Sequence, residues 1–160
     1  METTLEIVER SLSDIRSKRI AAALAYWTLK KGERRFPTRA DLIPREMKEF
    51  LQNLHLYDVL DDSTFRARLL GTAMINAVGQ EMTGSIIGAD TAHPVARRMF
   101  VVLSRALAAR EPLLMVAAQA VAKYTDGRGM ETLAMPLSDG GDKITHLFCA
   151  TAFIARPLPA

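Results

Sequence analysis

Residues 64–72 read TFRARLLGT, and residues 79–84 read GQEMTG. The first run alternates like a β-strand and stops at Gly71, and the residues between the two runs suffice for one short helix. Gly79, Gly84 and Gly88 then interrupt the chain again. A strand followed by short helical pieces forms the wall of a binding pocket more readily than a reaction centre.

The composition predicts one soluble globular domain. The chain has 160 residues, of which 49% are hydrophobic, and a formal net charge of only +3. Its arginines are scattered, so we expect no nucleic-acid partner. One cysteine fits a reducing compartment, the N-terminus lacks a signal peptide, and the apolar runs are too short for a membrane span. We therefore expect a cytoplasmic protein.

The N-terminal segment predicts a helix. Apolar residues recur at three- and four-residue spacing over 5–29, Lys30 and Lys31 suit a helix C-terminus, and Gly32 ends it. The SLSD run at 11–14 could instead divide this segment into two helices. The apolar stripe packs either on its own domain or on a second subunit. The residues of such a dimer interface would be Leu5, Val8, Leu12 and Ile15.

Hydrophobic spacing and turn residues predict the remaining elements. Pro44 begins an amphipathic helix that extends to Leu54. A strand at 56–60 precedes the one at 64–70, and after the short helical pieces a longer helix runs from Pro94 to Ala109. Three strands follow, at 113–124, 131–137 and 144–155. This order predicts an α+β fold, with an antiparallel sheet of about five strands and helices on one face.

The last predicted strand is apolar on both of its faces. Ile144, Phe148 and Ile154 point one way, while Leu147 and Phe153 point the other. An antiparallel sheet normally leaves one face to water. We therefore expect the N-terminal helix, from this subunit or from a partner, to cover the outer face of the sheet.

Five short motifs, in this order, resemble a known family. They are YW at 26–27, PTRADLIP at 37–44, RLLGT at 68–72, GQEMTG at 79–84 and MPLSDG at 135–140. The chain resembles a PAS domain, and more narrowly a bacterial single-PAS family first catalogued as a domain of unknown function. The resemblance extends from about Ala23 to Ile154. It departs from that family at Ala67, where an aromatic residue is usual, and this leaves space for a larger cavity.

The resemblance implies a domain organisation and a role. Residues 36–160 would form the PAS-like domain, and residues 1–35 an N-terminal helical segment for dimerisation or sheet cover. PAS domains hold a small molecule, or nothing, between sheet and helices, and they commonly dimerise through flanking helices. The chain would then be a homodimeric sensory module, not an enzyme. We expect it to act on a separate signalling protein, because it carries no output domain of its own.

Few residues could hold a metal or support catalysis. The three histidines and Cys149 include no pair at the spacing of a shared metal site on one helix, so no metal is expected. His93 lies just before the long helix, a poor position for a haem ligand, and Cys149 lies on a strand, not on the helical side of the pocket. Haem and flavin are therefore disfavoured, and we expect a colourless protein. Ser104 and Ser138 have no neighbouring base in sequence, which argues against nucleophilic catalysis.

Two arginines on the central strand allow two interpretations. Arg66 and Arg68 share a face with Leu70, opposite Phe65, Ala67 and Leu69. If the arginine face is inward, it requires an anionic partner; if it is outward, both arginines are surface residues. The apolar alternation favours the outward arrangement, in which Arg68 could still pair with Asp41 or Glu81.

The candidate pocket residues are aromatic, apolar or cationic side chains on the predicted sheet and helices. They are Trp27, Arg68, Met74, Met99, Phe100, Leu103, Leu114, Tyr124 and Phe148. Such residues more often simply fill a core than line a cofactor site. Three functions therefore stay open: a sensor that binds a small molecule or a protein partner, a ligand-free interaction adaptor, and a small α+β enzyme.

Overall fold

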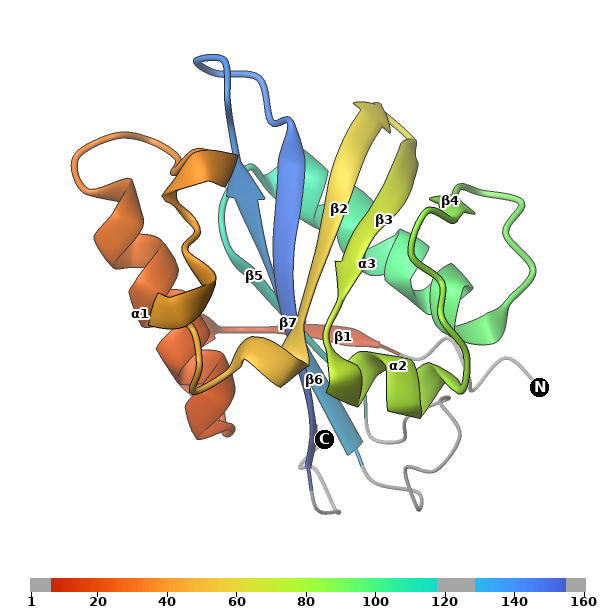
Figure 1. Ribbon diagram of the computed structural model, residues 1–160. Coiled ribbons are helices and arrows are strands. Elements are labelled where there is room, and N and C mark those ends of the chain that lie inside the picture. Colours follow the sequence, from red (N-terminus) through yellow and green to blue (C-terminus); the bar gives the residue numbers. More distant parts are fainter. Residues whose placement is uncertain (1–6, 118–128, 155–160) are drawn as a thin grey trace.

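The computed structural model describes residues 7–117 and 129–154, and within them one antiparallel sheet has the strand order β1-β5-β6-β7-β2-β3-β4 (Figure 1). The strands are β1 (Val8–Arg10), β2 (Leu54–Asp61), β3 (Thr64–Leu70), β4 (Ile86–Ile87), β5 (Leu113–Ala117), β6 (Gly129–Leu137) and β7 (His146–Ile154). The α-helices are α1 (Lys18–Lys31), α2 (Thr72–Val78) and α3 (Pro94–Ala109). The 3-10 turns are η2 (Leu12–Asp14), η3 (Arg39–Asp41), η4 (Pro44–Glu46) and η5 (Leu51–Asn53).

The five central strands, β5-β6-β7-β2-β3, are the five that the sequence predicts. The bounds of β3 and α3 agree with the predicted ones, and α2 fills the interval between the two glycine-containing runs. The two additional strands, β1 and β4, lie at the edges and have only three and two residues. Elements this short show no measurable alternation. Residues 118–124 of the predicted 113–124 strand lie outside the described ranges.

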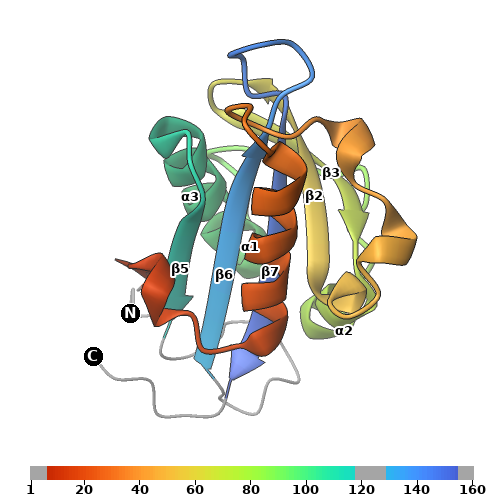
Figure 2. The ribbon, with the colours of Figure 1, turned by 90° about the vertical axis from the view of Figure 1, so that its left-hand side faces the viewer.

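Helices cover both faces of the sheet. Figure 2 shows α1 across β6 and β7 on one side and α3 on the opposite side. We call the face toward α2 and α3 the inner face, and the face toward α1 the outer face. Helix α1 packs on β6 and β7 of its own chain, which is one of the two arrangements that the sequence allows for the N-terminal helix.

The predicted start of the first helix is wrong. Residues 8–10 pair with β5 as strand β1, residues 12–14 form a 3-10 turn, and α1 begins only at Lys18. The hydroxyl of Ser17 accepts a hydrogen bond from the Ile20 amide and caps the helix there.

Because residues 8–14 form a strand and a turn and not a helix, the predicted interface residues do not form a helical stripe. Leu12 and Ile15 are half-buried against the core of their own domain. Val8 lies on the edge strand β1 with 48% of its surface exposed. Leu5 falls outside the described residues.

The predicted helix at 44–54 is also wrong. Pro44 does begin a helical turn, but the segment forms the two 3-10 turns η4 and η5. Met47 and Phe50 are buried and lie three residues apart, which matches 3-10 turns as well as an α-helix. Neither turn has a side-chain cap, so nothing local extends it into a longer helix.

Candidate functional site

Four polar side chains form a hydrogen-bonded cluster on the inner face. His55 and Tyr57 come from β2, Thr132 from β6 and Thr151 from β7, and all four are buried. His55 Nδ1 lies 2.8 Å from the Tyr57 hydroxyl, and His55 Nε2 lies 2.8 Å from Thr151 Oγ1. Thr151 Oγ1 lies 2.8 Å from Thr132 Oγ1. We call these four residues the inner-face cluster.

Burial keeps the cluster neutral. Desolvation lowers the pKa of His55 to about 3 and raises the pKa of Tyr57 well above its ordinary value. A neutral imidazole donates from one ring nitrogen and accepts at the other, and the hydroxyl groups can do both. The cluster can therefore recognise a polar, uncharged group by hydrogen bonding, but it supplies no charged acid or base near pH 7.

The space between the inner face and the helices is small. Two cavities of about 20 Å³ each are lined in common by Met74, Val78, Val95 and Met99. One of them also touches Thr151 and the buried Arg98, and the other touches Tyr57 and Ala67. Each has room for about one water molecule, far below the several hundred Å³ of a typical ligand site.

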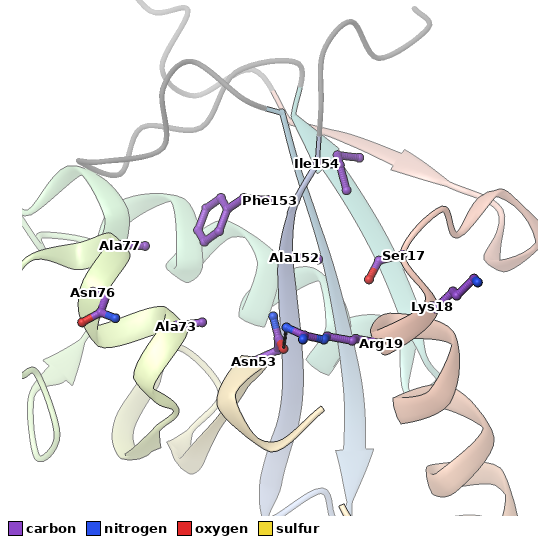
Figure 3. A pocket seen from close by; sticks show the side chains of 10 residues that line it. All are labelled: Ser17, Lys18, Arg19, Asn53, Ala73, Asn76, Ala77, Ala152, Phe153 and Ile154. Carbon is purple, nitrogen blue, oxygen red and sulfur yellow. Dashed lines mark hydrogen bonds between the residues drawn. The ribbon is translucent and has the colours of Figure 1, made fainter. Parts of the chain in front are cut away.

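A larger cavity, of about 540 Å³, lies at one end of the sheet (Figure 3). We call it the end pocket. It is lined by the start of α1, by η5, by α2 and by the end of β7. The residues are Ser17, Lys18, Arg19, Asn53, Ala73, Asn76, Ala77, Ala152, Phe153 and Ile154.

A family model described as PAS domain matches residues 15–150, which is most of the chain. The chain belongs to the PAS domain family. PAS domains are typically sensory modules, and this chain is a sensory module in that general sense. A search of curated proteins found no match.

Among solved structures, one similar chain is described as "Structure of an RNA-binding Light-Oxygen-Voltage Receptor". The sequence identity is 12%, the TM-score is 0.48, and the match covers 92% of this chain. This PAS domain spans 38% of that receptor chain.

The predicted pocket residues divide between the two faces of the PAS sheet. Met74 and Met99 line the inner-face cavities. Phe100 and Leu103 lie on the same helix, α3, where Phe100 meets Phe65 edge-on at 6.3 Å between ring centroids.

The other predicted pocket residues are not brought into that space. Trp27 lies on α1, and its indole N–H donates to the carbonyl of Pro136 on the outer side. By the alternation of β5 and β7, Leu114 and Phe148 also point to the outer face. Tyr124 falls outside the described residues. The aromatic pattern could not separate the two faces, since both are apolar.

Arg68 lies on the surface and pairs with Asp58, at 3.3 Å between Nε and Oδ2, not with Asp41 or Glu81. The pairing of β2 with β3 shifts at this point, with Leu56 opposite Leu69 but Tyr57 opposite Ala67. Arg68 is thus the extra residue of a β-bulge, and the alternation reverses after it. The expectation that Leu69 shares a face with Ala67 is therefore wrong: Leu69 lines the outer side, and Leu70 lines an inner-face cavity.

The inner-face cluster is not among the residues predicted from the sequence. The i, i+2 spacing of His55 and Tyr57 on a strand was available as a signal. Thr132 and Thr151 join them only through strand pairing, which a single sequence does not reveal. Cys149 is buried on β7, and desolvation raises the pKa of its thiol, so it is a poor nucleophile.

Within the described ranges, no group of three or more His, Cys, Asp or Glu side chains is placed to hold a metal ion. Among the same residues, no helix combines the length and apolar character needed to cross a bilayer.

The buried imidazole predicts a pH-dependent stability. Between pH 7 and pH 5 the unfolded chain protonates His55 near its ordinary pKa of 6.5, while the folded PAS domain does not. The unfolded state therefore binds more protons, and stability falls as the pH falls. We expect the free energy of unfolding to be about 2 kcal/mol lower at pH 5 than at pH 7.

Urea unfolding of the protein and of His55→Gln at both pH values measures this difference. The variant should lose most of the pH dependence in this window. Hydrogen bonds with Thr38 and Lys30 lower the pKa values of Asp41 and Glu46 respectively. These two carboxyl groups therefore change the free energy of unfolding mainly below pH 5. If the free energy of unfolding changed equally with pH in the two proteins, the result would contradict a neutral, buried His55.

Proposed function

We propose that this PAS domain senses a small molecule at the inner face and passes the signal to the packing of α1 on the outer face. The observation that carries the proposal is the position of Thr132 and Thr151. They lie on β6 and β7, the two strands against which α1 packs from the other side. A ligand that competes for these hydroxyl groups would change the strands that support α1.

A chain of hydrogen bonds supports the direction of this route. Asn53 Nδ2 donates to the backbone carbonyl of Thr151 at 3.0 Å. Arg19 Nη1, in the first turn of α1, donates to Asn53 Oδ1 at 3.4 Å. A change at Thr151 thus has a short physical path to the start of α1.

The proposal makes the PAS domain a non-enzymatic module with a separate signalling protein as its partner, in the cytoplasm. A homodimer is part of it. Since Leu12 and Ile15 pack in their own domain, the face of α1 that carries Ala21, Ala25 and Leu29 is the surface we propose for the second copy. Leu29 is 75% exposed. Sedimentation as a monomer at high micromolar concentration would contradict this part of the proposal.

The experiment removes the hydroxyl group of Thr151 and measures amide hydrogen exchange in α1. In Thr151→Val the side-chain shape is kept, while the bonds to His55 and Thr132 are lost. We expect amide hydrogen exchange to rise several-fold in the first two turns of α1, measured by mass spectrometry on the full chain. Thr72→Val, which changes an exposed threonine at the start of α2, is the control and should leave α1 unchanged. A uniform rise in all elements, or a rise confined to α3, would contradict transmission to α1.

The small size of the inner-face cavities favours one alternative, a ligand-free interaction adaptor with a filled core. Native mass spectrometry and the absorbance spectrum of the purified chain separate the two functions. A bound compound released by Met99→Ala, or a new small-molecule binder found by thermal shift, supports the sensor. A complete absence of binders supports the adaptor.

A further inference from the structure

The end pocket is distinct from the inner face in volume and in chemistry. Its volume of about 540 Å³ falls in the range of small-molecule sites, while the inner-face cavities have room for single waters. It opens where the start of α1, the η5 turn, α2 and the end of β7 come together (Figure 3).

One side of the end pocket is cationic and polar. Lys18 and Arg19 line it together with the amide of Asn53, and none of the described lining residues is acidic. Figure 3 shows Arg19 reaching across toward Asn53, while Lys18 points away from it. The nearby Glu131 carboxylate is buried behind Ser17 and accepts from the Ser17 and Arg16 amides, so the two cationic side chains leave this side with a net positive charge among the described residues, which favours an anion.

Arg19 is held by neutral acceptors. Its Nη1 donates to Asn53 Oδ1 at 3.4 Å, and the side-chain amide of Gln52 lies beside the guanidinium, where its oxygen accepts once the amide is turned by 180°. None of the ion pairs among the described residues includes Arg19. A guanidinium carries five N–H donors in a planar fork, so these two acceptors leave donors for a ligand.

The polar side is also preorganised. Asn53 is only 6% exposed, and its Nδ2 is fixed on the carbonyl of Thr151 at 3.0 Å. Its Oδ1 is therefore directed by the fold, and it orients the Arg19 guanidinium before any ligand arrives. Preorganised donors bind a ligand with a smaller entropy loss.

The opposite side of the end pocket is apolar. Small side chains from α2, Ala73 and Ala77, face the strand end that carries Ala152 and Phe153. Ala77 and Phe153 also line one of the inner-face cavities, so they form the wall between the two spaces. An apolar body would contact this wall while its polar head stays at Arg19.

We propose that the end pocket binds a small monocarboxylate with an apolar body, its carboxylate paired with the Arg19 guanidinium and its body packed on Ala73, Ala77 and Phe153. Carboxylate and guanidinium form two parallel charge-assisted hydrogen bonds, which a neutral head group cannot reproduce. The site shares Arg19 and Asn53 with the path proposed for the signal, but carboxylate binding is measured here without reference to that function.

The test titrates the full chain with octanoate and with 1-octanol, which has the same apolar length and no charge. The readout is the dissociation constant, together with the positions of amide shift changes in two-dimensional NMR spectra. We expect octanoate to bind at least about tenfold more tightly than 1-octanol, and Arg19→Gln to remove most of that difference. The shift changes should cluster at residues 17–19, 53, 73–77 and 152–154.

Two variants complete the test. Ala73→Leu fills the apolar side without a change of charge and should weaken octanoate by about tenfold or more, while Arg97→Gln, an exposed arginine on α3, should change nothing. Melting temperatures confirm that each variant folds. Equal binding of octanoate and 1-octanol, full binding by Arg19→Gln, no binding at all, or shift changes confined to Met74, Met99 and the inner-face cluster would each overturn the site.

Discussion

Gly71→Ala should destabilise the PAS domain by about 2–3 kcal/mol, because an added methyl group meets backbone that cannot move aside. A Cβ at Gly71 would collide with the carbonyl oxygen of Gln52 and would lie 2.8 Å from that of Leu51. The backbone of Gly71 has φ −67° and ψ 161°, which any residue adopts, so the expected loss comes from the contact alone.

The location of Gly71 explains why the backbone approaches so closely. The Gly71 amide donates to the carbonyl of Leu54 at 2.7 Å, at the junction of β3 and α2. This junction places α2 against η5, and both elements line the end pocket. A methyl group here would push the two elements apart.

Thermal unfolding measures the effect, and a loss of about 2–3 kcal/mol corresponds to a melting temperature lower by roughly 5–10 °C. Gly140→Ala is the matched control, since a Cβ there meets nothing within 4 Å and the φ angle is not positive. Its melting temperature should stay within about 1 °C of the unchanged protein. Equal stability of Gly71→Ala and Gly140→Ala would contradict the close approach.

The sequence at 64–72 predicts this region well, because the strand and the turn each follow from the residues of this run and do not depend on a distant partner. Alternation marked β3, and the glycine at its end marked the turn into α2. The bulge at Arg68 was not visible, because a bulge depends on the register with β2 and not on the residues of β3 itself. One extra residue was enough to exchange the faces of Leu69 and Leu70.

The N-terminal segment shows the opposite case. Its apolar spacing was compatible with a helix from Leu5, but the four residues of the SLSD run and Ser17 form caps and tight turns instead. Strand β1 forms by antiparallel pairing with the edge of β5. That partner is more than 100 residues away in sequence, so local pattern could not reveal it.

The candidate site was the least predictable part. The apolar residues of both faces satisfy the same pattern, so Trp27 and Phe148 were grouped with Met74 and Met99 although the sheet separates them. The inner-face cluster and the end pocket are each assembled from three or more elements far apart in sequence. Arg19 and Asn53 became neighbours only through the packing of α1 and η5 on the same end of the sheet.

Glu131→Ala should lower the free energy of unfolding by about 3 kcal/mol, because it removes a buried carboxylate that anchors the start of α1. Glu131 lies on β6 with no exposed surface. Its Oε1 accepts from the Ser17 amide at 2.6 Å and from the Arg16 amide at 3.2 Å, and its Oε2 lies 3.1 Å from the same Arg16 amide. Without it, two partly buried N–H groups lose their acceptor.

A glutamine at this position provides the sharpest comparison. Glu131→Gln keeps an oxygen where Oε1 accepts both amides and removes only the charge, so we expect a loss of about 1 kcal/mol. Glu9→Ala, at an exposed position on β1, is the control for losing a carboxylate and should be nearly neutral. Urea unfolding gives all three values, and hydrogen exchange should show the first turn of α1 opening in Glu131→Ala before the rest of the domain. Equal losses in the alanine and glutamine variants would show that charge, and not the hydrogen bonds to Arg16 and Ser17, holds α1 on the sheet.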